Sequence, residues 1–365
     1  MRNITCATLT FHRTTNYGAL FQTFALQKAL ESIGIWSEVL DYRCPTIENR
    51  YKVQPLRHFF NIKNLLKCII RNSYIRDNRN NFLNFTKEHI RLSETPYTPN
   101  TIATCNLKYN KFIVGSDQVW NPECMGGDSN YFLAFADSEK KNSYAASFGW
   151  AEFSEEQMSL FYKYLNDFKH ISIRESSGVE LVHKCIGRSA TLVLDPTLLL
   201  HQEWCDLATS VPRLIKDKYV VIYLMKETDS IFKRAIHYAK AHKMKVVYIN
   251  DRLFPKIGII NKFYAKPLEW LNLFYHSSAV FTNSFHGTAF ATNFNKPLWV
   301  ELLPEPSKSN SRLIDFLSLV HMENCIVRNN DYPIEHKIDF AEVNNILNNC
   351  RLNSITYLKE IFSNG

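Results

Sequence analysis

The segment FTNSFHGTAF, residues 281–290, places His286 beside Gly287 directly after an apolar run. The run predicts a buried strand, and the residues after it predict a short helix that begins near Gly287 or Thr288. The first N–H groups of a helix attract anions, and a glycine there lets a ligand approach the backbone closely. His286 could transfer a proton at this anion site. A histidine that caps the helix or lies in the core fits the same pattern, so both interpretations stay open.

Arg174 is a second candidate, because it ends the apolar segment ISIR. An arginine at the end of a buried strand must be paired or must face a ligand, and its planar fork fits a carboxylate or a phosphate. The competing interpretation is an ion pair with Glu175 or a salt bridge at a domain edge. Arg312, in SNSRLIDFL, precedes an amphipathic segment and could either reach the same anion or lie on the surface.

Polar residues mark three further strand ends. The loop RTTNYG offers Thr15 or Asn16 as the N-cap of a helix. The segment GSDQVW is expected to expose Asp117 and Trp120, a carboxylate for sugar hydroxyls and a ring for the apolar face of a sugar. A tight Gly-Ser-Asp turn explains that segment equally well. Asp195 precedes a proline, and we interpret this pair as a turn.

Short apolar segments alternate with helical patterns along the chain, which predicts parallel sheets covered by helices. The expected strands are 3–11, 35–42, 111–120, 142–149, 170–178, 190–200, 219–225, 245–250, 279–283 and 297–302. We place one α/β domain at residues 1–210 with a basic, helical insertion at about 48–95, a second domain at 211–335, and a helical segment at 336–365. Ligands bind at the carboxyl ends of parallel strands, so the candidate residues are expected to meet in a cleft between the domains.

The composition narrows the class of protein. The 365 residues are 45% hydrophobic and carry a net charge of +8 without a dense Lys/Arg run. This balance disfavours nucleic-acid binding and favours anionic ligands or an anionic membrane surface. The nine cysteines are scattered and form no C-x-x-C pair, as expected for reduced thiols.

Several motifs are missing from the sequence. It has no signal-peptide pattern, and no apolar run of the roughly 18 residues that a membrane span needs. It also lacks the motifs of metal, nicotinamide, ATP and serine-hydrolase chemistry. We therefore expect a cytoplasmic protein, with peripheral contact to the inner face of the membrane as an open alternative.

Six segments carry a family resemblance. They occur in the order TTNYGALFQTFALQKAL, FIVGSDQVWNP, NSYAASFG, SIRESSG, LDPTLLL and FTNSFHGTAF, between about residues 4 and 320. Together they resemble the polysaccharide pyruvyl transferase family. The resemblance implies two Rossmann-like domains in a glycosyltransferase-B-like arrangement with an interdomain cleft. It also implies phosphoenolpyruvate as donor, no further cofactor and no metal, and a surface-polysaccharide sugar or its lipid diphosphate-linked precursor as acceptor.

The resemblance assigns roles to individual residues. The family's catalytic histidine falls on His286, and the arginine of its S-x-R-[ED] motif falls on Arg174, so both are expected to be catalytic. Many members carry an arginine two positions before the histidine, where this chain has Ser284, so Arg312 or else Arg13 is expected to replace it. The expected donor-binding residues are Arg174, Ser284, His286, Gly287, Thr288 and Arg312. The expected acceptor-binding residues are Asn16, Tyr17, Ser116, Asp117 and Trp120.

Two other functions remain open. A glycosyltransferase that uses a nucleotide sugar would have the same fold, but many such enzymes carry two glutamates eight positions apart, whereas Glu301 and Glu305 are four apart. A sugar-binding protein without activity would explain the serine at position 284 as a decayed donor site. The acceptor sugar and the oligomeric state are not indicated by the sequence.

Overall fold

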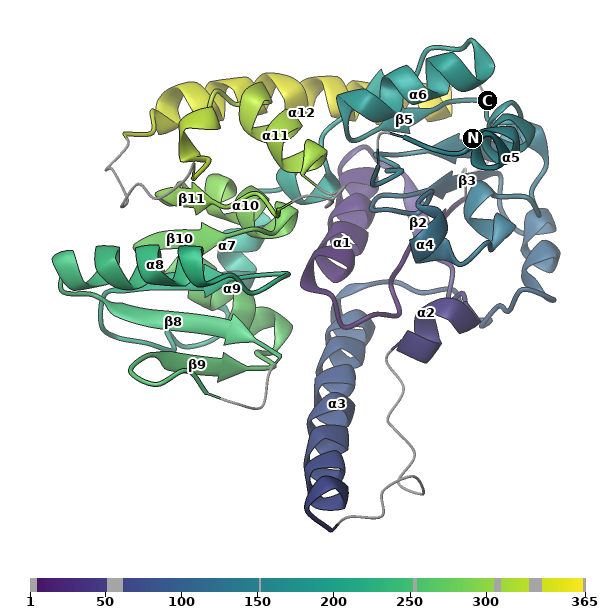
Figure 1. Ribbon diagram of the computed structural model, residues 1–365. Helices are drawn as coiled ribbons and strands as arrows, with labels where there is room; N and C mark the ends of the chain where they lie inside the picture. The colour runs from purple at the N-terminus through teal and green to yellow at the C-terminus, as the bar shows by residue number, and fades with distance from the viewer. Residues whose placement is uncertain are drawn as a thin grey trace.

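The computed structural model describes residues 5–50, 62–150, 152–251, 255–304, 310–327 and 337–363. These residues form two parallel α/β units that lie side by side, with one long helix running across both (Figure 1).

The first unit is built on a parallel sheet in the order β2-β1-β3-β4. Its strands are β1 (Thr5–Leu9), β2 (Trp36–Val39), β3 (Lys111–Val114) and β4 (Lys141–Ser143). Parallel bridges from Asn142 to His170 and from Ala146 to Ile173 extend it towards a strand pair, β5 (Ser172–Ile173) and β6 (Thr191–Leu192). Apolar residues of three helices pack on one face, namely α4 (Pro122–Met125), α5 (Glu155–Leu165) and α6 (Ser176–Ile186).

The second unit is a five-stranded parallel sheet in the order β11-β10-β7-β8-β9. Its strands are β7 (Tyr219–Tyr223), β8 (Lys245–Asn250), β9 (Ile260–Phe263), β10 (Ala279–Thr282) and β11 (Leu298–Val300). Helix α8 (Asp229–Ala241) covers one face. Helices α9 (Pro267–Tyr275) and α10 (Phe285–Asn293) cover the other, and α11 (Ser311–Leu319) follows β11. The sequence did not predict β9, because this half-buried edge strand has no continuous apolar run.

Helix α1 (Tyr17–Ser32) occupies the centre of the molecule. Thirteen of its sixteen residues are buried, so it has no solvent face and packs on both units. Phe21 shows this, since its ring lies 5.5 Å from Trp204 of α7 (Gln202–Thr209), 5.5 Å from Trp270 of α9 and 5.3 Å from Phe290 of α10. An aromatic core therefore joins the two units.

Helix α12 (Phe340–Ser363) is a single helix where the sequence allowed one or two. Its first half buries Val343 and Leu347 against the core shared by both units, and its second half buries Tyr357 and Leu358 against the first sheet. The Tyr357 hydroxyl donates to the carbonyl of Ser143 at 2.9 Å. This helix therefore fastens the end of the chain to the first unit.

The insertion expected at about 48–95 contains the whole of α3 (Ile62–His89), which follows the short helix α2 (Pro45–Arg50). Helix α3 projects from the body of the molecule (Figure 1), and its second half packs on α1 through Phe82 and Phe85. Over the described ranges, no helix has both the length and the apolar composition to cross a bilayer.

Candidate active site

His286 lies in the first turn of α10. This helix begins at Phe285, with Ser284 as N-cap, and the Ser284 hydroxyl accepts from the N–H of Gly287 at 3.3 Å. The predicted strand-to-helix turn is therefore confirmed. The imidazole lies against Gly18 of α1 so closely that a Cβ added there would be 1.9 Å from Nδ1 of His286. The histidine of the second unit thus reaches the first unit at a glycine.

Asp195 of the first unit faces His286. Its Oδ2 lies 3.7 Å from Nε2 of His286 and accepts from Nη1 of Arg174 at 2.6 Å and from the hydroxyl of Ser116 at 3.2 Å. Its Oδ1 accepts from the N–H of Thr197 at 3.0 Å. Burial opposes the charge of this carboxylate, but the proximity of His286 and the charge of Arg174 hold the pKa of Asp195 well below its usual range. A fully buried aspartate therefore stays ionised beside the histidine.

The turn expected at Asp195 is present, since Asp195 caps a short 3-10 helix, Pro196–Leu198. Interpreting it only as a turn missed its contacts with Arg174 and His286. The sequence did contain a signal for these contacts. Asp195 is a charged residue at the end of the apolar segment TLVL, just as Arg174 is a charged residue at the end of ISI.

Arg174 is buried among three carboxylates. Besides Asp195, it has Asp117 at 3.5 Å from Nη2 and Glu175 at 3.9 Å from Nε. Its guanidinium carbon lies 4.7 Å from the ring centre of Phe285, on α10. Burial opposes its charge, but the three carboxylates raise the pKa of Arg174 above its ordinary value. The expected pairing of Arg174 is therefore present, with Asp195 as the nearest partner.

Arg312, at the start of α11, is buried near Arg174. Burial, and then the charge of Arg174, lower the pKa of Arg312, although a guanidinium stays protonated at neutral pH. With the Gln118 amide oxygen turned towards α11, that oxygen accepts from Nη1 and Nη2 of Arg312 at 3.3 and 3.2 Å. Within the described part of the chain, no carboxylate forms a salt bridge with Arg312, and its Nε makes no hydrogen bond. This buried cation could therefore take an anionic ligand.

Gly287 and Thr288 were expected to leave the start of α10 open to a ligand, but both residues are buried. A Cβ at position 287 would lie 2.5 Å from Oγ1 of Thr282, so this glycine allows α10 to pack on β10. Thr288 is fully buried, and its hydroxyl has no hydrogen-bond partner among the described residues.

The expected acceptor side needs correction at Trp120. The strand ends at Val114, and the Trp120 ring is fully buried, with its indole N–H donating to the carbonyl of Tyr131 at 3.0 Å. The expectation of an exposed ring is wrong, because the ring packs between Phe132 and Phe148.

The other four acceptor candidates lie close to the site, but most of them already make hydrogen bonds within the protein. Ser116 is fully buried and also donates to the carbonyl of Ala145 at 2.9 Å. The Tyr17 hydroxyl donates to the carbonyl of Ala265 at 2.5 Å, a contact between the two units. Asn16 caps α1 by accepting from Ala19 N–H at 3.1 Å. Of these four, Asn16 and Asp117 remain partly exposed.

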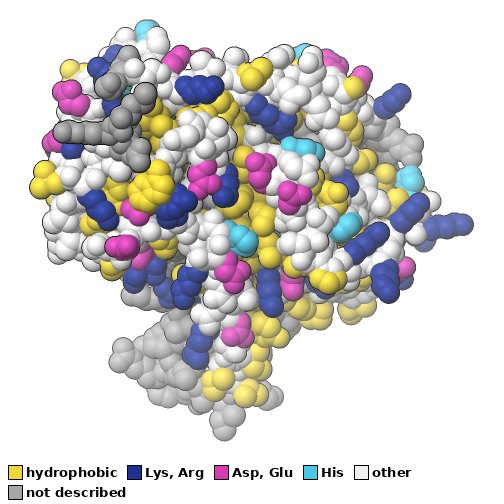
Figure 2. Space-filling model, turned by 180° about the vertical axis from the view of Figure 1, so that it is seen from behind, with side chains coloured by type: hydrophobic (Ala, Val, Ile, Leu, Met, Phe, Trp, Pro, Cys, Tyr) yellow, Lys and Arg dark blue, Asp and Glu magenta, His cyan; other side chains and the backbone are white. Residues whose placement is uncertain are grey.

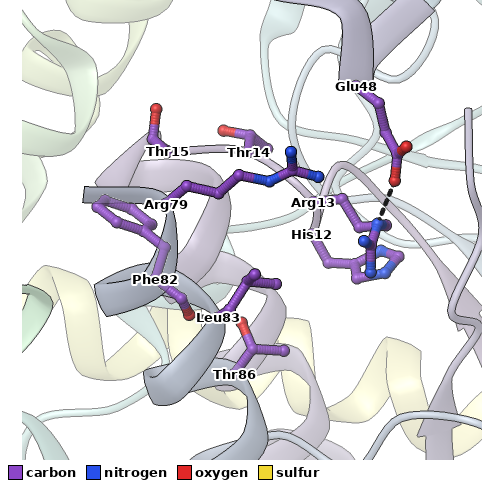
Figure 3. A pocket seen from close by; sticks show the side chains of 9 residues that line it. All are labelled: His12, Arg13, Thr14, Thr15, Glu48, Arg79, Phe82, Leu83 and Thr86. Atoms are coloured by element: carbon purple, nitrogen blue, oxygen red, sulfur yellow. Dashed lines mark hydrogen bonds and ion pairs between the residues drawn. The ribbon is translucent and has the colours of Figure 1, made fainter. Parts of the chain in front are cut away.

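A small polar pocket lies beside the β1–α1 loop (Figure 3). His12, Arg13, Thr14 and Thr15 line it from the loop, and Glu48, Arg79, Phe82, Leu83 and Thr86 line it from α2 and α3. Nη1 of Arg13 pairs with Asp41 at 2.9 Å, and its Nε pairs with Glu48 at 2.5 Å. Arg13 is therefore less free than Arg312 to replace the arginine that Ser284 lacks.

A larger cavity of about 360 Å³ lies where α11 and α12 meet the first unit. Arg174 and Asp195 line it together with Phe285, and its other walls are largely apolar. The described residues contain no group of three or more His, Cys, Asp or Glu side chains that could hold a metal ion, and the nine cysteines are free thiols.

Comparison with known proteins places the chain in context. A family model described as polysaccharide pyruvyl transferase matches residues 16–300, which is most of the chain. No curated protein gives a match.

Among solved structures, UDP-GlcNAc 2-epimerase from Methanocaldococcus jannaschii has a TM-score of 0.50 at 9% identity, covering 94% of this chain and 91% of its own. The UDP-GlcNAc-bound epimerase from Neisseria meningitidis has a TM-score of 0.46 at 10% identity, covering 98% and 92%. The heptosyltransferase WaaC from E. coli with ADP has 0.41 at 13% identity, covering 84% and 89%. With the two parallel sheets, the first likeness confirms the expected two Rossmann-like domains in a glycosyltransferase-B-like arrangement.

Proposed function

The chain belongs to the polysaccharide pyruvyl transferase family, and we propose that it transfers the pyruvyl group of phosphoenolpyruvate to a sugar of a surface polysaccharide or to its lipid diphosphate-linked precursor. The supporting observation is the meeting of His286 from one domain with Asp195 and Arg174 from the other, beside the buried cation of Arg312.

The donor carries a carboxylate and a phosphate, and each needs hydrogen-bond donors. Arg312 offers a guanidinium that forms no salt bridge with a carboxylate of the described residues and whose Nε makes no hydrogen bond there, and buried charge-assisted hydrogen bonds of this kind are strong. Nη1 of Arg174 donates to Asp195, whereas its buried Nε and Nη2 make no hydrogen bond with the described residues, so its proposed part is to place that carboxylate and to donate to the ligand. The hydroxyl of Ser284 is a further proposed donor at the start of α10.

In the proposed reaction, two hydroxyl groups of the sugar lose their protons, and both oxygens become bonded to C2 of the pyruvyl group as a ketal. One hydroxyl attacks C2 of phosphoenolpyruvate while a proton is added to the C3 methylene, which becomes a methyl group. The C2–O bond to phosphate then breaks, a second hydroxyl attacks C2, and the last proton leaves with phosphate. His286 is the proposed proton donor and acceptor, and the Asp195 carboxylate orients its ring and stabilises its protonated form.

The first experiment is calorimetric titration of the purified protein with phosphoenolpyruvate. We expect binding that is at least about tenfold weaker in Arg312→Gln, since a charge-assisted hydrogen bond contributes roughly 1.5–3 kcal/mol. Arg76→Gln is the matched control, because Arg76 is an exposed arginine of α3. Equal binding by Arg312→Gln would remove Arg312 from the donor site. Binding of UDP-GlcNAc in place of phosphoenolpyruvate would support the nucleotide-sugar alternative.

A second experiment tests the chemistry. His286→Ala should lower phosphate release in the presence of acceptor by roughly 10²–10⁴, the usual contribution of general acid–base catalysis. Wild-type turnover in this variant would exclude the proposed role of His286.

A further inference from the structure

The first half of α3 exposes a stripe of large apolar side chains. Leu66 is 59% exposed, Ile69 and Ile70 are each 45% exposed, and Tyr74 is 43% exposed. Their spacing of three, four and eight residues from Leu66 places them on one face of the helix. We call these four residues the α3 stripe. Figure 2 shows hydrophobic side chains along this projection of the molecule.

The α3 stripe is not the face by which the helix packs on the protein. Cys68 and Asn72 are buried in the same turns and point the other way round the helix. Further along, Phe82 and Phe85 make the contacts with α1. Tyr74 is the exception, since its ring stacks on that of Tyr264 at 5.7 Å between ring centres, and the apolar surface left to solvent is mainly that of Leu66, Ile69 and Ile70. The stripe therefore projects apolar surface into solvent, which monomeric proteins rarely do without a partner.

The sequence around the stripe is basic. Between Ile62 and Arg79 the sequence carries five basic residues and one acid, namely Lys63, Lys67, Arg71, Arg76 and Arg79 against Asp77. Arg71 and Arg76 are exposed. Apolar residues flanked by Lys and Arg are typical of a helix that lies in the interface of an anionic membrane.

We propose that α3 docks this protein on an anionic phospholipid surface. The α3 stripe enters the boundary between headgroups and acyl chains, while Arg71 and Arg76 contact lipid phosphates. Charge favours this occupant over a second copy of the chain, because two such faces would bring like charges together.

The position of α3 beside the candidate active site suggests how docking on a membrane would serve the reaction. This inference rests on the proposed function. Arg79 and Phe82, on the same helix, line the pocket of Figure 3. The Phe82 ring lies 5.1 Å from that of Tyr17, the neighbour of the glycine that contacts His286. Docking through α3 would therefore bring the pocket of Figure 3 close to a membrane-attached acceptor.

Docking itself is tested without substrates, by co-sedimentation of the full chain with vesicles. We expect binding to vesicles of phosphatidylglycerol and phosphatidylcholine, and little to phosphatidylcholine alone. The pair Arg71→Gln and Arg76→Gln should weaken binding by roughly tenfold or more, since each basic residue near an anionic surface contributes on the order of fivefold. Ile69→Ser with Ile70→Ser should weaken it at least as much.

Matched controls separate docking from general surface effects. Leu107 is 92% exposed on the 3-10 helix Ile102–Leu107, so Leu107→Ser removes an exposed apolar residue elsewhere. Lys184→Gln with Lys233→Gln removes two exposed positive charges from α6 and α8. Wild-type vesicle binding by both α3 double variants would overturn the proposal. Absence of vesicle binding, with self-association that Ile69→Ser and Ile70→Ser abolish, would instead assign the stripe to a second copy of the chain.

Discussion

Replacing Gly18 by alanine should displace the candidate catalytic histidine without unfolding the protein. The added Cβ would lie 1.9 Å from Nδ1, 2.3 Å from Cγ and 2.4 Å from Cε1 of His286. Ordinary contact begins near 3.4 Å, so the ring must move by about 1.5 Å. The ring cannot move that far and keep its 3.7 Å approach to Asp195.

A misplacement of about 1 Å in a catalytic group can cost roughly 10² in rate, and we expect a loss of this size in kcat for Gly18→Ala. Alanine favours a helix over glycine by about 0.5–1 kcal/mol, so α1 should not be weakened. The assay is phosphate release from phosphoenolpyruvate with acceptor, beside a urea unfolding curve.

A double-mutant cycle makes this prediction specific. In a His286→Ala background there is no ring to displace, so Gly18→Ala should cause almost no further loss. If the two losses multiply instead, Gly18 acts on the reaction by another route and the reasoning from the contact is refuted. A large fall in the unfolding midpoint of Gly18→Ala alone would also refute it.

Three further variants have expected outcomes. The pKa of Asp195 is lower in the folded protein than in the unfolded chain, so the unfolded chain is protonated first as the pH falls. The ionised Asp195 therefore stabilises the fold fully above the ordinary aspartate pKa of about 3.9, and this stabilisation is lost as the pH falls below that value. Thermal unfolding of Asp195→Asn should therefore show lower stability at pH 7 and a smaller decline towards pH 3 than the wild type, whereas equal slopes would contradict the assignment. Trp120→Ala should cost about 3–5 kcal/mol in urea unfolding, as for a core tryptophan, and an effect under 1 kcal/mol would indicate an exposed ring. Tyr17→Phe should cost about 0.5–1.5 kcal/mol, because the carbonyl of Ala265 loses its donor, and unchanged unfolding would argue against that contact.

The alternation of apolar runs and helical patterns was enough to predict the parallel sheets of both domains. The edge strand β9, with Asn261 and Lys262 in a four-residue segment, carries too weak a pattern to be predicted. The end of a strand at Gly-Ser-Asp was expected, and β3 does end at Val114, but the sequence did not show that the following turn places Trp120 in the core.

The candidate site was predictable where a polar residue ends an apolar run. His286 and Arg174 satisfied that rule, and the structure brings both to the Asp195 carboxylate. The roles of Gly18 and Gly287 could not be predicted, because they depend on the neighbour that fills the space of the missing side chain. Such contacts join segments distant in sequence, and local patterns carry no information about them.

The aromatic core around Phe21 has a consequence for how members of this fold can diversify. When two domains meet through a polar interface, relatives can exchange whole domains and so combine new donors with new acceptors. Here Phe21 is enclosed by Trp204, Trp270 and Phe290, and a foreign half would have to supply rings of matching shape. Recombination at the boundary is therefore constrained by the shapes of these four rings.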